Sequence, residues 1–296
     1  MSGADRAPLR RCRERRIRGA ALAAAPLYIF TLIFVFAPLL YMPALSFMRR
    51  EGSWGVAAVF TLRNYARIAD PVYLATFVQS IKLALLSTVL TILAGYPFGY
   101  FMARLSPAWR SRVMLLLIIP FWTSSLMRLY GWIIVFRANG TLDHLLMGLG
   151  LTKEPLRFLY SYPSVVSGMV YALAPFMIYS VYASAEKLDW DLVDAARDLG
   201  ASPLRAFLTV SLPLTMPGLF SGVVLTFVPS MGLFFIADIL GGNKVALAGN
   251  LIQEQLMKAH DWPFAAALSM ALMALTSLLL FLYRRLTRSD FLEGLV

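Results

Sequence analysis

The 296-residue sequence contains few side chains of the kinds that perform covalent chemistry. His144 and His260 are far apart, and neither has a cysteine or a pair of carboxylates at the spacing of metal ligands. Cys12 is the one cysteine, which excludes an internal disulfide, and no G-x-x-x-x-G-K-[ST] segment is present to hold the phosphates of ATP. We therefore expect no catalytic centre, no metal site and no cofactor in this chain.

The most informative chemistry lies in residues 186–213, which read EKLDWDLVDAARDLGASPLRAFLTVSLP. Acidic side chains outnumber basic ones here, the acids being Glu186, Asp189, Asp191, Asp194 and Asp198. Such a segment is poorly suited to resting on anionic lipid. An apolar stripe with helical spacing accompanies the acids, formed by Leu192, Val193, Ala196 and Leu199. The combination predicts a helix that docks on a protein partner.

Local rules predict two short helices in this segment. Asp191 can cap the first helix, and Gly200 can supply its left-handed exit. Ser202 can cap the second helix, with Pro203 at its first position, and Pro213 is expected to limit its extension. The segment is therefore predicted to fold as a helix-Gly-helix loop.

The elements around this loop are long apolar stretches. Hydrophobic residues make up 59% of the chain and charged residues 15%, against roughly 45–50% and about 25% in a soluble domain. Five stretches without Asp, Glu, Lys or Arg are long enough to cross a bilayer: Gly19–Met48, Leu83–Ala103, Phe158–Ala185, Ala206–Ala237 and Trp262–Tyr283. Val113–Phe136 is a sixth, interrupted by Arg128 alone. We predict an all-α membrane protein of about six transmembrane helices, in which the two longest stretches include ends that do not span.

The basic residues predict the orientation of these helices. With both termini in the cytoplasm, 16 basic residues lie inside and nine lie in the outer loops, as the positive-inside rule requires. The predicted organisation is a basic cytoplasmic tail (1–18), a transmembrane domain (19–285) and a cytoplasmic C-terminal tail (286–296). The first apolar stretch is about twice as long as a signal-peptide core, so we expect a retained anchor. Anionic membrane lipid accounts for the net charge of +11, and no nucleic acid is needed.

Small residues and prolines within the apolar stretches indicate how the helices pack. Pro97, Pro120, Pro175 and Pro229 each remove a backbone hydrogen bond, and four such breaks together favour helices that line a solute path. Gly218 and Gly222 have the small-x-x-x-small spacing that lets a second helix approach closely.

The loop 186–213 also resembles a known family. Its residues Asp194, Ala195, Ala196, Gly200, Val210, Leu212 and Pro213 are similar in type and spacing to the E-A-A, G, I-x-L-P signature of ABC-importer permeases. The departures are Asp194 for Glu and Val210 for Ile, so the reach of the acidic contact is shorter by one methylene. The resemblance implies a type I importer permease whose cytoplasmic coupling loop docks in a groove on an ATPase subunit.

Further stretches resemble the first permease of the spermidine/putrescine importers. They are Tyr96–Phe98, Ile119–Thr123, Ala195–Ser202, Pro213–Gly218, Met231–Phe234, Asp238 with Gly241–Gly242, Gly249–Asn250 and Asp261–Phe264. The similarity runs from about Thr61 to about Tyr283. It implies a non-catalytic, multi-pass subunit of the bacterial inner membrane. Its expected partners are a second permease, two ATPase subunits that carry ATP and magnesium, and a periplasmic solute-binding protein.

A path for polyamines needs carboxylates, carbonyls or aromatic faces to replace water around the ammonium groups. Asp238 is an acid at the edge of a predicted span, and the aromatic candidates are Trp122, Tyr130, Phe234 and Phe235. Arg128 and Lys82 oppose a cationic solute, unless they reach the membrane surface or pair with acids of the second permease.

Two alternatives therefore stay open. The first is an importer of the same type for an amino acid, an opine or a phosphonate. The second is an ATP-independent secondary carrier or channel, although nothing in that class requires the spacing from Asp194 to Pro213. Putrescine and spermidine cannot be ranked from the sequence.

Overall fold

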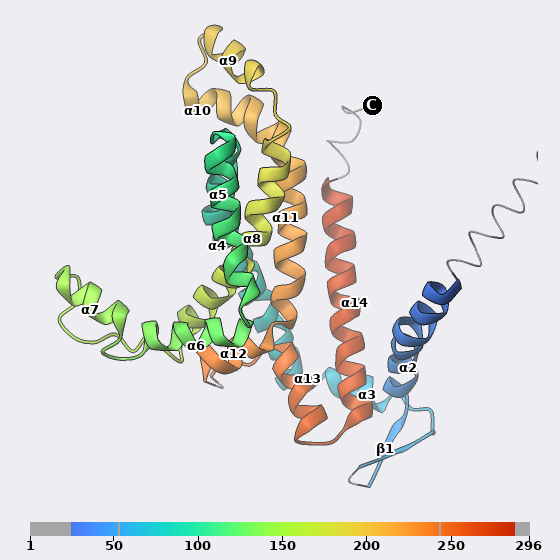
Figure 1. The fold of residues 1–296 in the computed structure, drawn as a ribbon. Helices are drawn as coiled ribbons and strands as arrows, with labels where there is room; N and C mark the ends of the chain where they lie inside the picture. The colour runs from blue at the N-terminus through green and yellow to red at the C-terminus, as the bar shows by residue number, and fades with distance from the viewer. Residues whose placement is uncertain (1–24, 53, 243, 288–296) are drawn as a thin grey trace, which may run out of the picture.

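The computed structural model describes residues 25–52, 54–242 and 244–287, and its long elements are all helices (Figure 1). The predicted basic tail, residues 1–18, lies outside the described residues, as do residues 288–296 of the predicted C-terminal tail. The one sheet in the described part is a short hairpin of β1 (Arg49–Glu51) and β2 (Gly55–Ala57).

Five helices are long and apolar enough to cross a membrane, and each contains most of one predicted stretch. They are Ala25–Ser46, with η2 (Leu32–Phe36) and α2 (Ala37–Ser46); α4 (Pro71–Arg104); α8 (Tyr162–Ala185); Pro203–Gly232; and α14 (Trp262–Thr287). Helix α4 begins well before its charge-free stretch because Asp70 caps it, accepting a hydrogen bond from the Val72 amide at 3.1 Å. At 34 residues, roughly 50 Å long, it exceeds the bilayer core of about 30 Å.

Close packing of α4, α8 and the helix Pro203–Gly232 forms the centre of the bundle. A β-carbon on Gly218 would lie 2.5 Å from the Ser180 carbonyl oxygen, and one on Gly99 would lie 2.7 Å from that of Ile178. Ser180 also donates its hydroxyl to the Gly218 carbonyl at 2.9 Å. The predicted close approach at Gly218 is therefore confirmed, with α8 as the neighbour.

The sixth predicted span, Val113–Phe136, is wrong as a single straight helix. The chain bends by 97° between the helical runs Pro107–Trp122 and Ser125–Gly148. These runs contain α5 (Pro107–Ile118), the 3₁₀ turn η3 (Ile119–Trp122), α6 (Ser125–Phe136) and α7 (Thr141–Gly148). Pro120 tightens the end of α5 into the 3₁₀ turn, and Thr123 is extended, with ψ of 150°. Up to six crossings remain if the bent pair counts as one span.

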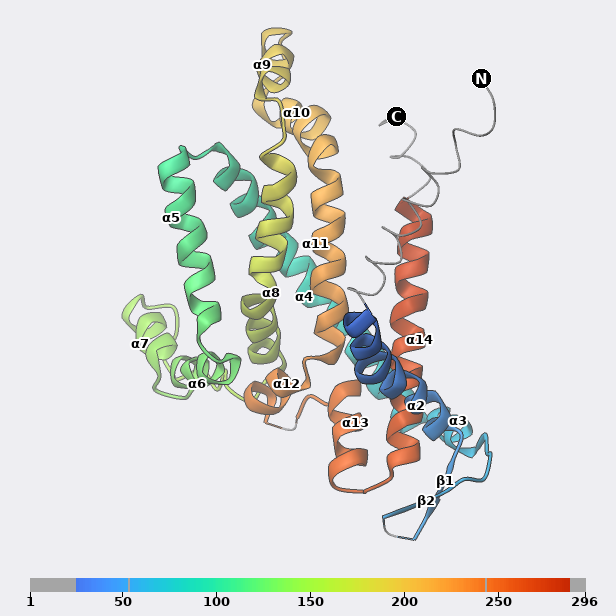
Figure 2. The same ribbon diagram turned by 45° about the vertical axis from the view of Figure 1, so that its right-hand side comes forward.

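The long stretch Ala206–Ala237 is also divided, at Leu233, whose ψ of 55° lies outside the helical range. The short helices α12 (Phe234–Gly241) and α13 (Ala248–Met257) follow. Figure 2 shows these helices at one end of the bundle with α6, α3 (Arg63–Ile68) and the hairpin. The opposite end carries α9 (Trp190–Asp198) and α10 (Pro203–Ala206). The two ends thus carry separate sets of predicted functional residues.

Candidate functional site

The loop 186–213 folds as two helices joined at Gly200. Helix α9 ends in a pair of backbone hydrogen bonds, from Gly200 to Arg197 at 2.9 Å and from Ala201 to Ala196 at 3.1 Å. This Schellman ending requires a left-handed residue, and Gly200 has φ of +88°. Ser202 caps α10 by accepting from the Arg205 amide at 3.3 Å, with Pro203 directly after it. Both features were predicted from the sequence and are confirmed.

Two details of the predicted loop are wrong. Asp189, not Asp191, caps α9, and its carboxylate accepts from the Asp191 amide at 3.1 Å. The cap lies earlier because Trp190 is already helical and packs inward. Pro213 does not limit the second helix, which continues through η4 (Phe207–Ser211) and α11 (Leu212–Gly232) as one run. Pro213 is tolerated because it follows a π turn, as the second residue of α11.

The predicted apolar stripe divides between two faces of α9. Val193 is buried, and Trp190 and Ala196 pack partly buried against the same core cluster of α4 and α8 side chains. Leu192 and Leu199 point away from this core and are 50% and 90% exposed. The neighbouring Ala195, Asp194 and Asp198 are exposed too, as is Leu204 on α10. The outer face of α9 is therefore an apolar strip beside acids, which suits a protein groove.

The predicted path residues divide among three cavities at the opposite end. Asp238 and Tyr130 line one cavity of about 390 Å³ with Tyr160 and Lys244. Phe235 lines a second, of about 340 Å³, and Phe234 lines a third, of about 310 Å³. Trp122 lines none of these three and is 81% exposed. The structure thus brings together Asp238 and Tyr130, and separates them from the other three candidates.

Helix α13 holds the Asp238 carboxylate in place. The Asn250 side-chain amide donates to Asp238 Oδ1 at 2.5 Å and to the Phe234 carbonyl at 3.2 Å. Sequence reasoning did not identify Tyr160 or Lys244 as cavity residues. Tyr160 is distant from α12 in sequence, but its backbone amide donates to the Leu240 carbonyl at 3.0 Å. No local pattern predicts such a long-range contact.

Arg128 is not in the middle of a straight span, because it lies on α6 just beyond the bend. Its guanidinium lies 4.6 Å from the centre of the Phe121 ring, and Nη2 donates to Ser125 Oγ at 3.0 Å. It lines the second cavity together with Phe235. Aromatic and hydroxyl contacts thus stabilise part of this guanidinium, whereas its buried Nε has no hydrogen-bond partner among the described residues.

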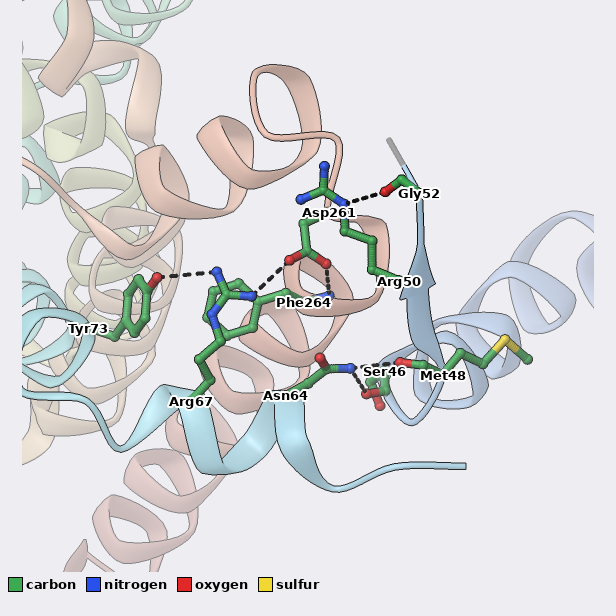
Figure 3. Close-up of polar contacts among 9 residues, drawn as sticks. All are labelled: Ser46, Met48, Arg50, Gly52, Asn64, Arg67, Tyr73, Asp261 and Phe264. Atoms are coloured by element: carbon green, nitrogen blue, oxygen red, sulfur yellow. Dashed lines mark hydrogen bonds and ion pairs between the residues drawn. The ribbon is translucent and has the colours of Figure 1, made fainter. Parts of the chain in front are cut away.

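The Asp261–Phe264 motif anchors the short helix α3 to α14 (Figure 3). Asp261 is buried, and its carboxylate forms an ion pair with Arg67 at 2.8 Å and accepts from the Phe264 amide at 3.2 Å. The Arg67 guanidinium also lies 3.8 Å from the centre of the Phe264 ring. Burial would lower the pKa of Arg67, but hydrogen bonds to Asp261 and Tyr73 raise the pKa above its ordinary value.

The fold and these sites define a multi-pass helical membrane protein with an exposed pair of short helices, α9 and α10, at one end and small cavities at the other. Residues 95–289 match the family described as binding-protein-dependent transport system inner membrane component. The chain belongs to this family, whose members are membrane components of transport systems rather than enzymes.

Similar proteins narrow the class further. The chain is 43% identical to the spermidine/putrescine transport system permease protein PotB of Escherichia coli (strain K12), over 86% of this chain and 93% of that one. It is 39% identical to the protein of the same name from Haemophilus influenzae, over 89% of this chain and 92% of that one. A solved bacterial ABC transporter involved in alginate import has the same fold, with a TM-score of 0.71, 17% identity and coverage of 95% and 99%.

Proposed function

We propose that this chain is a permease subunit of an ATP-driven importer for polyamines such as putrescine and spermidine. The observation that carries the proposal is the 43% identity to a spermidine/putrescine permease, which extends over 86% of the chain. The folded loop 186–213 supports it, because α9 presents small and apolar side chains on a rigid, capped helix.

The proposed complex has a second permease, two ATPase subunits that bind ATP and magnesium, and a periplasmic solute-binding protein. In this arrangement the outer face of α9 docks on an ATPase, with Asp194, Ala195 and Leu199 at the contact. Asp194, Ala195, Ala196, Gly200, Val210, Leu212 and Pro213 are the proposed coupling residues. Ala196, Val210 and Leu212 pack against the permease core, so their proposed role is to hold the exposed residues in position.

The proposed location is the bacterial inner membrane, with both termini in the cytoplasm. The 16 to nine partition of basic residues supports this orientation. It puts α9 and α10 on the cytoplasmic side, where ATP is available, and it puts the Asp238 cavity on the outer side. A carboxylate and two aromatic rings, Tyr130 and Tyr160, suit an arriving ammonium group.

The direct test is ATP hydrolysis by the complex reconstituted in liposomes with its solute-binding protein. Putrescine and spermidine should stimulate hydrolysis, whereas amino acids, opines and phosphonates should not. Stimulation by one of those other solutes would support an ABC importer with a substrate other than a polyamine. Solute uptake without a co-purifying ATPase would instead indicate a secondary carrier or channel.

A further inference from the structure

An aromatic cluster links the inner face of α9 to the end of α4. The Trp190 ring packs edge-on against Tyr100, with ring centres 5.5 Å apart, and the Arg104 guanidinium lies 4.5 Å from the centre of the Trp190 ring. Tyr100 also packs edge-on against Phe207 of η4, at 5.3 Å. These contacts connect the coupling loop to the membrane helices through the inner face of α9. No exposed residue of α9 takes part in them.

Two buried hydrogen bonds continue this link between α4 and the helix Pro203–Gly232. The Tyr100 hydroxyl donates to Ser211 Oγ at 2.9 Å, and the hydroxyls of Tyr96 and Thr215 lie 2.7 Å apart. Each pair is separated from the other by four residues on both helices, so the bonds stand one turn apart. Buried hydroxyl pairs of this kind fix one register between two helices.

The same helix has an irregular backbone where these bonds attach. Residues 207–211 form a π turn, in which the Leu212 amide bonds to the Phe207 carbonyl. Pro213 and Pro217 follow and have no amide hydrogen to donate. A π turn and two prolines reduce the regular backbone bonding that resists bending. The contacts from α4 to Phe207, Ser211 and Thr215 therefore hold a segment whose own backbone bonding is reduced.

We propose that Trp190, Tyr100 and Phe207, together with the hydrogen bond from Tyr100 to Ser211, form the linkage that carries movement of α9 into α4 and the helix Pro203–Gly232. The inference rests on the proposed function, because it assumes that an ATPase moves α9. It assigns positioning roles to buried residues on the inner side of the loop, which the docking surface does not include.

The test measures two properties separately: binding of the ATPase to the permease, and stimulation of ATP hydrolysis by the solute. Trp190→Ala and Tyr100→Phe should leave the ATPase co-purifying at normal stoichiometry, since neither side chain is on the outer face of α9. Solute-stimulated hydrolysis relative to basal hydrolysis should fall about fivefold or more in each, the lower end of typical coupling between sites. Trp190→Phe should recover part of the stimulation because it restores a ring.

Trp109 provides a matched control within the same chain. It is a tryptophan with an arginine over its ring, Arg112 at 5.0 Å, but it is 58% exposed on α5. Trp109→Ala should leave stimulation unchanged. Tyr100→Phe removes only a hydroxyl, so it tests the linkage even where Trp190→Ala does not insert in the membrane.

Three other outcomes would contradict either the linkage or the proposed function. Normal stimulation in Tyr100→Phe and Trp190→Ala would overturn the linkage. Loss of the ATPase from the purified Trp190→Ala and Tyr100→Phe complexes would also overturn it, because the cluster would then only support the docking surface. Absence of ATPase from the wild-type preparation would reject the proposed function itself.

Discussion

Asp238 shares its cavity with one cation and two aromatic rings, and this neighbourhood determines what the carboxylate can do. In Asp238→Asn the side-chain oxygen can still accept from Asn250, so the local structure should persist while the negative charge is lost. We expect about tenfold weaker apparent affinity for a polyamine, equivalent to roughly 1.4 kcal/mol. Uptake of labelled spermidine into vesicles measures this effect, with assembly and basal ATP hydrolysis unchanged.

The control for Asp238 is a neighbouring acid outside the cavity. Glu254 lies exposed on α13 at the same end of the bundle. Glu254→Gln removes the same charge and should leave uptake as it is. Equal uptake by the Asp238→Asn variant and the wild type would reduce Asp238 to a partner of Asn250.

Gly200 is constrained by its backbone alone, because a β-carbon there would meet no atom within 4 Å. Gly200→Val should cost about 1–2 kcal/mol of local strain at a positive φ, re-aim α10 and lower solute-stimulated hydrolysis. Gly200→Asn should retain more activity, since asparagine tolerates the left-handed region. Hydrolysis assays on the purified complexes rank the variants.

Gly148 is the matched control for Gly200, because it too has open surroundings but lacks a positive φ. Gly148→Val should behave as the wild type. If Gly200→Val were equally active, the left-handed turn would not position α9 for the proposed docking.

Sequence reasoning at the residue scale succeeds where the chemistry is local. Gly200 and Ser202 act on amides within a few residues, so their types and positions are sufficient. Asp189 replaces Asp191 as the cap because Trp190 packs on Tyr100 of another helix, which local rules do not include. Tyr160 lines the Asp238 cavity because it contacts α12, which is distant in the sequence, and local rules do not include that contact either.

At the scale of elements, charge-free length predicts helices but not their bends. Val113–Phe136 has a suitable length and composition, yet the chain turns by 97° around Thr123. Pro120 indicated a weak point, but a proline within a helix produces anything from a mild kink to a break. Pro97 and Pro175 illustrate this range, because both lie inside continuous helices. Neighbouring contacts decide the outcome, and these are not visible in a local pattern.

Helix α3 holds the ends of two membrane helices together, and this role is testable. The Asn64 side chain donates to the carbonyls of Ser46, the last residue of α2, and Met48, while Arg67 pairs with Asp261 before α14 (Figure 3). Arg67→Ala leaves a carboxylate with 6% exposure unpaired. We expect it to lower the free energy of unfolding in detergent by about 2 kcal/mol.

Arg63, exposed on the same short helix, controls for loss of a positive charge on α3. Arg63→Ala should stay within about 0.5 kcal/mol of the wild type. Asp261→Asn keeps an oxygen for the Phe264 amide and should be destabilised less than Arg67→Ala. Equal stability of all three variants would show that the α3 contacts add nothing to the fold.

At the scale of the whole molecule, the bend lets α5 cross the bundle while α6 and α7 stay at one end. In Figure 2, α5 runs between the two ends, and α6 lies across the end that carries α12. The number of crossings stays at six if the bent segment counts as one span, and the charge partition then still applies. Composition could predict that number, but not which residues make the third crossing.

Cysteine labelling in a Cys12→Ser background tests both the orientation and the bend. Ser202→Cys, on the exposed loop 186–213, should react only from the cytoplasm, and Glu51→Cys, on the hairpin, only from outside. Thr123→Cys distinguishes a straight third span from a bent one. In a straight Val113–Phe136 helix it would be deep in the bilayer and unreactive, whereas at the end of the α5 crossing it should react from outside. If Ser202→Cys reacted only from outside and Glu51→Cys only from the cytoplasm, the proposed orientation would be reversed. An unreactive Thr123→Cys would support the straight span.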